Sequence, residues 1–146
     1  MRFTYLASLI LATVVLSAAE PGPLFTTVTW DSVYDNPDGS LTTVACSTGK
    51  NGMITKGFNY FKELPSFPFI GGGDVIEAYD SVNCGSCWAL VYEGVLVTVL
   101  AIDSFQSGFN IAEEAMDVLT GNRSRELGQV EITAYRFPNS QCGLED

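Results

Sequence analysis

The sequence predicts a small, mostly-β barrel that carries one or two helices. Most of the chain after residue 19 divides into short stretches rich in β-branched and aromatic residues, separated by Asn, Asp, Gly and Pro turn signals. Only one stretch has a convincing helical period. The 127 residues that follow position 19 suit a single domain. Such a domain can bury roughly two thirds of the surface of its unfolded chain.

The first segment, residues 1–19, has the pattern of a secretory signal peptide. Arg2 precedes an apolar run centred on residues 9–16, and Ser17 and Ala19 have the small-residue spacing of a signal peptidase site. A membrane anchor is the alternative, but the apolar run is short for that role. We therefore expect residues 20–146 to form one secreted domain that does not associate with membranes.

Three stretches in the first half of the domain are candidate strands. Residues 26–35 alternate β-branched and aromatic side chains and end at an Asn-Pro-Asp-Gly turn, and residues 41–47 and 75–80 are shorter candidates. Residues 65–74, PSFPFIGGGD, are rich in Pro and Gly. We expect that segment to be an ordered loop without regular structure.

The second half contains a hairpin and a final strand. Residues 87–103, CWALVYEGVLVTVLAID, form two apolar arms around a Glu93-Gly94 turn, and the second arm is apolar enough to be buried on both faces. In residues 129–137, Val130, Ile132 and Ala134 alternate on one face, which predicts a half-buried strand.

One helix is predicted over residues 110–121. Asn110 is a suitable N-cap with an acidic residue three positions later, and Gly121 is a suitable stop. An apolar stripe at helical spacing should face the core, and residues 123–127 favour one more helical turn. The stripe consists of Ile111, Ala112, Ala115, Met116 and Leu119.

Charge and composition exclude several classes of function. Without the leader and its Arg2, the chain has 6 basic and 17 acidic side chains, a formal charge of −11. Phosphate backbones and anionic membranes repel such a surface, so we expect no nucleic-acid partner. The chain contains no histidine, which excludes Ser-His-Asp and Cys-His catalysis and zinc sites that use His.

The stretch NCGSCWAL, residues 83–90, admits three readings: a redox motif, half of a zinc site, or two unrelated disulfides. A redox motif is usually followed by a helix, but a β-rich hairpin follows here. If the chain is extended at this point, Cys84 and Cys87 point to opposite faces and seek different partners. With Cys46 and Cys142, a secreted chain of this size favours two long-range disulfides.

Asn122-Arg123-Ser124 is an N-glycosylation acceptor just beyond the predicted helix, where a glycan would be exposed. We expect a glycoprotein modified at Asn122.

Six blocks of the chain resemble, in order, those of the cerato-platanin family of secreted fungal proteins. The blocks are VTWDSVYD, LTTVACSTGKNGMITKGF, LPSFPFIGGG, NCGSCWALVYEG, VLAIDSFQSGFNIAEEAMDVLTG, and LGQVEITAYRF followed by QCGL. This resemblance implies a six-stranded double-psi β-barrel like the N-terminal domain of expansins, with peripheral helices. It also implies the disulfides Cys46–Cys84 and Cys87–Cys142 and makes Trp88 a packing residue.

The resemblance implies a non-catalytic protein that binds chitin oligomers, loosens cellulose as expansins do, and is recognised at the plant cell surface as an elicitor. It implies an extracellular location, with the fungal cell wall as one site. We expect a monomer that can assemble at interfaces, with no cofactor and no metal. The preferred polysaccharide is left open.

Neutral sugars are held by aromatic faces and by directional hydrogen bonds, and six residues near strand ends or turns offer these groups. Each also has a structural alternative: packing for the two aromatic residues, the Asn-Pro turn for the first aspartate, and the helix cap for the last asparagine. The candidate carbohydrate-binding residues are Trp30, Tyr34, Asp35, Asn83, Asp103 and Asn110.

Asp103 is the sharpest candidate because a carboxylate at the end of an apolar strand needs water or hydrogen bonds. In the family, the matching Asp lies on the groove at the place of a catalytic acid in related endoglucanases. A weak glycan hydrolase is therefore the alternative function, with Asp35 or Asp74 as the second carboxylate. Two residues depart from the family pattern: Ser104 stands where His is frequent, and Trp30 where Tyr is usual.

Overall fold

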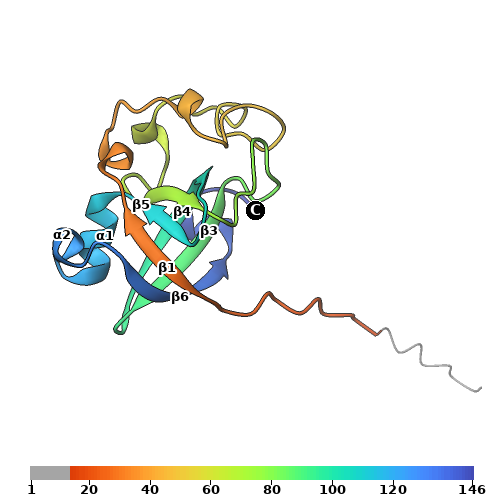
Figure 1. Cartoon of the computed structure of the whole chain (residues 1–146). Helices are drawn as coiled ribbons and strands as arrows, with labels where there is room; N and C mark the ends of the chain where they lie inside the picture. Colours follow the sequence, from red (N-terminus) through yellow and green to blue (C-terminus); the bar gives the residue numbers. More distant parts are fainter. Residues whose placement is uncertain (1–13) are drawn as a thin grey trace, which may run out of the picture.

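A computed structural model describes residues 14–146 and shows a closed six-stranded barrel in this range (Figure 1). The strand order around the barrel is β1-β5-β2-β4-β3-β6, and the β1–β5 and β2–β4 pairs are parallel. Closure leaves no free sheet edge. The strands are β1 (Leu24–Trp30), β2 (Ile70–Gly73), β3 (Ser86–Tyr92), β4 (Val95–Ser104), β5 (Phe109–Ile111) and β6 (Val130–Phe137).

The predicted hairpin and final strand are confirmed. β3 and β4 pair in register from Ser86–Ala101 to Tyr92–Val95 around the Glu93-Gly94 turn, and β6 pairs with β3 on the other side. The second arm is buried at Val97 and from Val99 to Ile102, half-buried at Thr98, and exposed at its first two residues. Val130, Ile132 and Ala134 are buried, as the alternation on β6 predicted.

Four predictions for the first half were wrong in whole or in part. Residues 26–35 form a strand only as far as Trp30, and Ser32–Asp35 then form a 3-10 helix. Residues 41–47 and 75–80 are 3-10 helix and turns instead of strands. The expected loop at 65–74 contains strand β2, which is held between β4 and β5. The 3-10 helices are η1 (Ser32–Asp35), η2 (Leu41–Thr43), η3 (Phe61–Glu63) and η4 (Asn139–Cys142).

The predicted helix is present but begins later than expected. It is α1 (Glu113–Thr120), which ends at Gly121 in the left-handed conformation, and α2 (Ser124–Leu127) follows it beside the barrel (Figure 1). The whole predicted apolar stripe is buried, and α1 packs against β3 and β4. Asn110 is not the N-cap, since it lies in β5 and Ala112 occupies the cap position.

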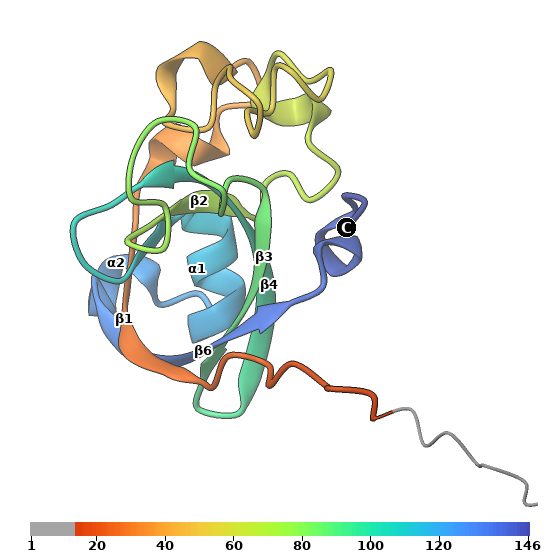
Figure 2. The same ribbon diagram turned by 90° about the vertical axis from the view of Figure 1, so that its right-hand side faces the viewer.

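The loops gather at one end of the barrel, and the β3–β4 turn lies at the other (Figure 2). Cys46–Cys84 ties two of these loops together, and Cys87–Cys142 fastens η4 to β3. Both pairs agree with the expected connectivity. The premise about local geometry was wrong, however, because Cys84 lies in a turn and Gly85 has φ of 77°.

Trp88 is a core residue. Its side chain is buried, its ring centroid lies 5.6 Å from that of Phe109, and its indole nitrogen donates to Ser86 Oγ at 2.9 Å. NCGSCWAL is therefore a structural junction in which a turn, two disulfides and a core strand meet.

Two sequence predictions concern the signal peptide and membrane-spanning segments. Residues 1–13 of the predicted signal peptide lie outside the described residues, so the predicted domain boundary stays a prediction. Between residues 14 and 146, none of the helices has the length and apolar character needed to cross a bilayer.

Asn122, the predicted glycosylation acceptor, is exposed in the turn between α1 and α2, with φ of 63°.

Candidate functional site

The best-defined polar arrangement is a row that crosses four strands near the loop end of the barrel. In the strand register, Thr29 of β1 faces Asn110 of β5, Asn110 faces Gly72 of β2, and Gly72 faces Asp103 of β4. A register shift between Gly71 and Gly72 brings Asp103 into this row. The sequence places these four residues far apart, and only barrel closure brings them together.

Gly72 is buried at the centre of the row, where neighbouring groups approach its backbone closely. A Cβ atom at this position would lie 3.0 Å from the carbonyl oxygen of Ser104 and 3.3 Å from the hydroxyl of Tyr34. Any side chain would therefore crowd the space between Asn110 and Asp103. This close approach explains why a weak strand former occupies a central strand.

Asp103 is held by three hydrogen bonds from the protein. Its Oδ1 accepts from the backbone N–H groups of Ala45 and Ser104, both at 2.9 Å, and its Oδ2 accepts from the Tyr34 hydroxyl at 3.1 Å. These bonds satisfy the requirement for a carboxylate at the end of an apolar strand. An ionised carboxylate offers about four acceptor positions, so about one is left for a ligand.

Tyr34 is buried beneath this carboxylate in η1. Burial, followed by the negative charge of Asp103, raises the pKa of the Tyr34 phenol far above its usual value. Tyr34 therefore stays a neutral O–H donor to Asp103 over the physiological range of pH. Its ring packs against Phe61 with centroids 6.2 Å apart, which leaves the hydroxyl as its functional end.

Asn110 adds the amide at the other side of Gly72. Its Oδ1 accepts from Thr29 Oγ1 at 3.0 Å, and this bond orients the amide. An amide held by its oxygen presents its NH₂ group as a donor. Asp103 and Asn110 thus combine an acceptor and a donor on either side of Gly72.

The structure brings together three of the six predicted residues, Tyr34, Asp103 and Asn110. The other three lie elsewhere and make structural bonds. The Trp30 indole donates to the carbonyl oxygen of Ser124 at 2.8 Å, and the amide of Asn83, on an exposed loop, donates to the carbonyl oxygen of Val75 at 3.0 Å.

Asp35 lies at the N-terminus of α1, a position that the sequence did not predict. Its two carboxylate oxygens accept from the backbone N–H groups of Glu113 at 2.7 Å and Glu114 at 2.9 Å. Asp35 therefore caps the helix from a distant part of the sequence, and the predicted cap Asn110 is free for the row.

The candidate partners of Asp103 for hydrolysis are both engaged. Asp35 caps α1, and Asp74 Oδ2 accepts from the backbone N–H of Gly108 at 2.8 Å. A shallow hollow next to Asp103 is lined by Asp74, Ile76, Glu77 and residues 104–106. Within residues 14–146, no group of three or more Cys, Asp or Glu side chains is arranged to hold a metal ion.

Thr29 and Gly72 were missed by the sequence analysis. Alternation in Val-Thr-Trp places Thr29 on the outward face of a strand, and this was the only signal available for it. Gly72 carried no signal, because its role depends on a pairing that cannot be read from one segment.

The fold and this row define a small β-barrel with two disulfides and a row of polar groups on its wall. The chain belongs to the cerato-platanin family, whose model, described as "Cerato-platanin", matches residues 26–144.

Relatives and solved structures agree with this assignment. The "Heat-stable 19 kDa antigen" of Coccidioides immitis (strain RS) is 41% identical over 146 residues, which covers 99% of this chain and all of that protein. The crystal structure of cerato-platanin 3 from M. perniciosa has a TM-score of 0.80 at 38% identity, covering 83% of this chain and 100% of that one. The solution structure titled "the fungal elicitor Cerato-Platanin" has a TM-score of 0.72 at 31% identity, covering 80% and 95%.

Proposed function

We propose that this protein is a secreted, non-catalytic carbohydrate-binding protein of the fungal cell wall that takes chitin oligomers along the row of Thr29, Asn110, Gly72 and Asp103, the proposed groove. The observation that carries the proposal is the row formed by Asn110, Gly72 and Asp103. It offers one amide donor and one carboxylate acceptor on either side of Gly72, which suits the hydroxyl and acetamido groups of a neutral sugar.

The hydrogen bonds to Asp103 favour binding over bond cleavage. Backbone N–H groups of Ala45 and Ser104 and the Tyr34 hydroxyl all donate to this carboxylate. A carboxylate that accepts three hydrogen bonds is preorganised as an acceptor and is not positioned to protonate a leaving group. Loosening of cellulose, like that by expansins, would then follow from binding alone.

Elicitor activity on plants is the second part of the proposal. It is supported by family membership and by the solved relative that is titled a fungal elicitor. The antigen relative is consistent with a protein that is displayed outside the cell. The proposed location is therefore the culture fluid and the fungal wall.

Titration of the folded protein with N-acetylglucosamine oligomers tests the binding site. Asp103→Ala should weaken binding by about 1–3 kcal/mol, which is about 5- to 150-fold, because it removes a charge-assisted acceptor. Asp103→Asn keeps the shape and should give a smaller loss. Asp38→Ala is the matched control, since Asp38 is exposed and, in the described part of the chain, its one ion pair is with Lys62. An unchanged titration for both Asp103 variants would make Asp103 purely structural.

A further inference from the structure

A second surface lies at the opposite end of the barrel from Asp103. The strand register places Phe25 of β1 beside Thr133 of β6, Thr133 beside Val91 of β3, and Val91 beside Leu96 of β4. This outward row begins with a phenyl ring that is 82% exposed and ends with a leucine that is 50% exposed. Tyr135, two residues beyond Thr133 on β6, adds a second partly exposed ring on the same face.

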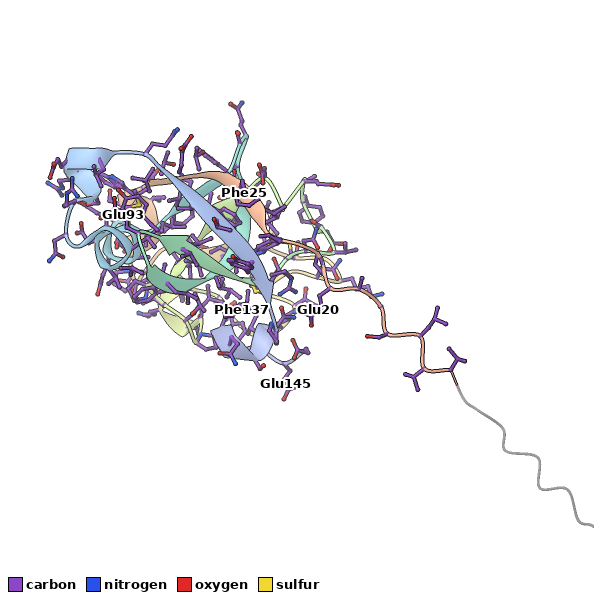
Figure 3. The ribbon with its side chains drawn as sticks, turned by 90° about the horizontal axis from the view of Figure 1, so that it is seen from below. Glu20, Phe25, Glu93, Phe137 and Glu145 are labelled. Atoms are coloured by element: carbon purple, nitrogen blue, oxygen red, sulfur yellow. A yellow bond between two sulfur atoms is a disulfide. The ribbon has the colours of Figure 1, made fainter. Side chains whose placement is uncertain are left out.

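Three members of this row, Phe25, Val91 and Thr133, line a hollow of about 590 Å³. Two carboxylates also line it, Glu93 from the β3–β4 turn and Glu131 from β6. Figure 3 labels Phe25 on β1 and Glu93 on the turn, seen from below. Threonine side chains line the space between ring and carboxylates, among them Thr27 and Thr133.

The hollow is negatively charged. Between residues 14 and 146, neither Glu93 nor Glu131 takes part in an ion pair. Arg123 is close enough to Glu93 to interact with its charge, but its guanidinium pairs with Glu126 through two contacts of 3.3 Å. The two carboxylates therefore stay available to a ligand, and an exposed aromatic face attracts cations as well.

We infer that this hollow binds a cationic, polyhydroxylated chain, namely an oligomer of glucosamine. The phenyl ring offers a stacking face for a sugar ring, the threonine hydroxyls can bond its hydroxyl groups, and the carboxylates pair with its ammonium groups. A polyanion would be repelled. A second copy of this chain is disfavoured, because a symmetric contact would bring Glu93 and Glu131 of both copies together.

The hollow is separate from the groove of the proposed function. Glu93 precedes β4 and Asp103 lies near its far end, so roughly 30 Å of extended strand divides the two sites. The proposal adds a second ligand class at a second place. A protein that holds two polysaccharide chains at once would link them, and a wall that presents both ligands together would be bound with an avidity above that of either site.

Titrations with glucosamine oligomers and with N-acetylglucosamine oligomers of equal length, at mildly acidic pH and low salt, test this inference. Phe25→Ala should weaken binding of the glucosamine oligomer by about two- to tenfold. Glu93→Gln combined with Glu131→Gln should weaken it by about two- to twentyfold, and high salt should remove most of that effect. Asp38→Asn combined with Glu145→Gln makes the same charge change elsewhere and should leave binding unchanged.

The two proposed binding sites can be tested independently. Asp103→Ala should leave the contribution of Phe25 and the two glutamates to glucosamine binding intact, and neutral oligomers should not respond to changes in the hollow. If the hollow variants bind glucosamine oligomers as the wild type does, the inference is wrong. It is also wrong if a lysine oligomer of equal charge binds as tightly and responds to Phe25→Ala in the same way, because the hollow would then be a general cation site.

Discussion

Tyr34 and Asp103 show how a single hydrogen bond sets the chemistry of the groove. The phenol is buried, and it donates to a carboxylate that the backbone of Ala45 and Ser104 also holds. The pair is oriented before a ligand arrives. Preorganised acceptors bind hydroxyl groups without the entropy loss of ordering a free side chain.

The raised pKa of Tyr34 predicts a specific pH dependence of stability. The folded protein holds the phenol proton more tightly than the unfolded chain, in which tyrosine ionises near pH of about 10. This contribution is therefore complete below about pH 10 and is lost as pH rises toward the higher folded pKa. Tyr34→Phe should cost about 1–2 kcal/mol at neutral pH and reduce the loss at alkaline pH.

The measurement is the free energy of unfolding in urea as a function of pH, for the wild type, Tyr34→Phe and Tyr135→Phe. Tyr135 is half exposed, so its variant controls for loss of one phenol. Equal alkaline slopes for the wild type and Tyr34→Phe would contradict the role given to the buried phenol.

At the scale of single elements, helix α1 depends on a residue that is distant in sequence. Asp35 in η1 accepts from the first two backbone N–H groups of α1, where its charge also favours the positive end of the helix dipole. Asp35→Ala should lower the free energy of unfolding by about 1–2 kcal/mol. Asp35→Asn, which keeps an acceptor, should recover part of it.

Urea unfolding of both variants beside Asp38→Ala measures this cap. Asp38 is an exposed aspartate three residues away, so its loss should have little effect. A cost for Asp35→Ala no larger than for Asp38→Ala would show that water replaces the cap.

Elements with local signals were predicted well, and those made by long-range pairing were not. The β3–β4 hairpin and β6 follow from alternation and one turn, and α1 follows from its apolar stripe. Strand β2 was missed because Ile-Gly-Gly-Gly has low strand propensity. Glycine is needed at position 71 because a Cβ there would lie 2.4 Å from the carbonyl oxygen of Asn110. Only the folded barrel reveals this close approach.

The same distinction applies to the site. Asp103 could be found because a carboxylate ends an apolar strand, which is a local anomaly. Trp30, Asp35 and Asn83 were selected on residue type and position in the chain, and these say nothing about which side chains meet. Asn110 was the expected cap of the helix, but Asp35 caps α1 and Asn110 lies in the polar row. The cap comes from a residue that is distant in sequence, so the local pattern could not identify it.

At the scale of the whole molecule, the two disulfides brace different parts of the barrel. Cys46–Cys84 closes a separation of 38 residues and Cys87–Cys142 one of 55, so each should stabilise by about 4 kcal/mol. Only the first adjoins the groove. The N–H of Cys46 donates to the carbonyl oxygen of Ile102, directly beside the bond between Ala45 and Asp103.

Replacing each pair by serine should therefore separate stability from binding. Both double variants should unfold at lower urea concentration by similar amounts. Affinity for N-acetylglucosamine oligomers should fall in the Cys46/Cys84 variant and persist in the Cys87/Cys142 variant under conditions where both are folded. Equal affinities would mean that the loop carrying Ala45 does not need its disulfide to position Asp103.

The final prediction is that the protein does not cleave the polysaccharides it contacts. A glycoside hydrolase needs a proton donor and a second carboxylate at a separation set by its mechanism. Here Asp103 accepts three hydrogen bonds, Asp35 caps α1, and Asp74 holds the backbone of Gly108, so each carboxylate is committed to an acceptor role. The chain contains no histidine that could serve as the acid. Prolonged incubation with chitin and cellulose oligomers, followed by mass spectrometry, should show no shortened products beyond the molar amount of protein. Products in excess of that amount, absent with Asp103→Asn but present with Asp38→Ala, would establish a hydrolase and overturn the binding function, because the three bonds to Asp103 would then have to rearrange during turnover.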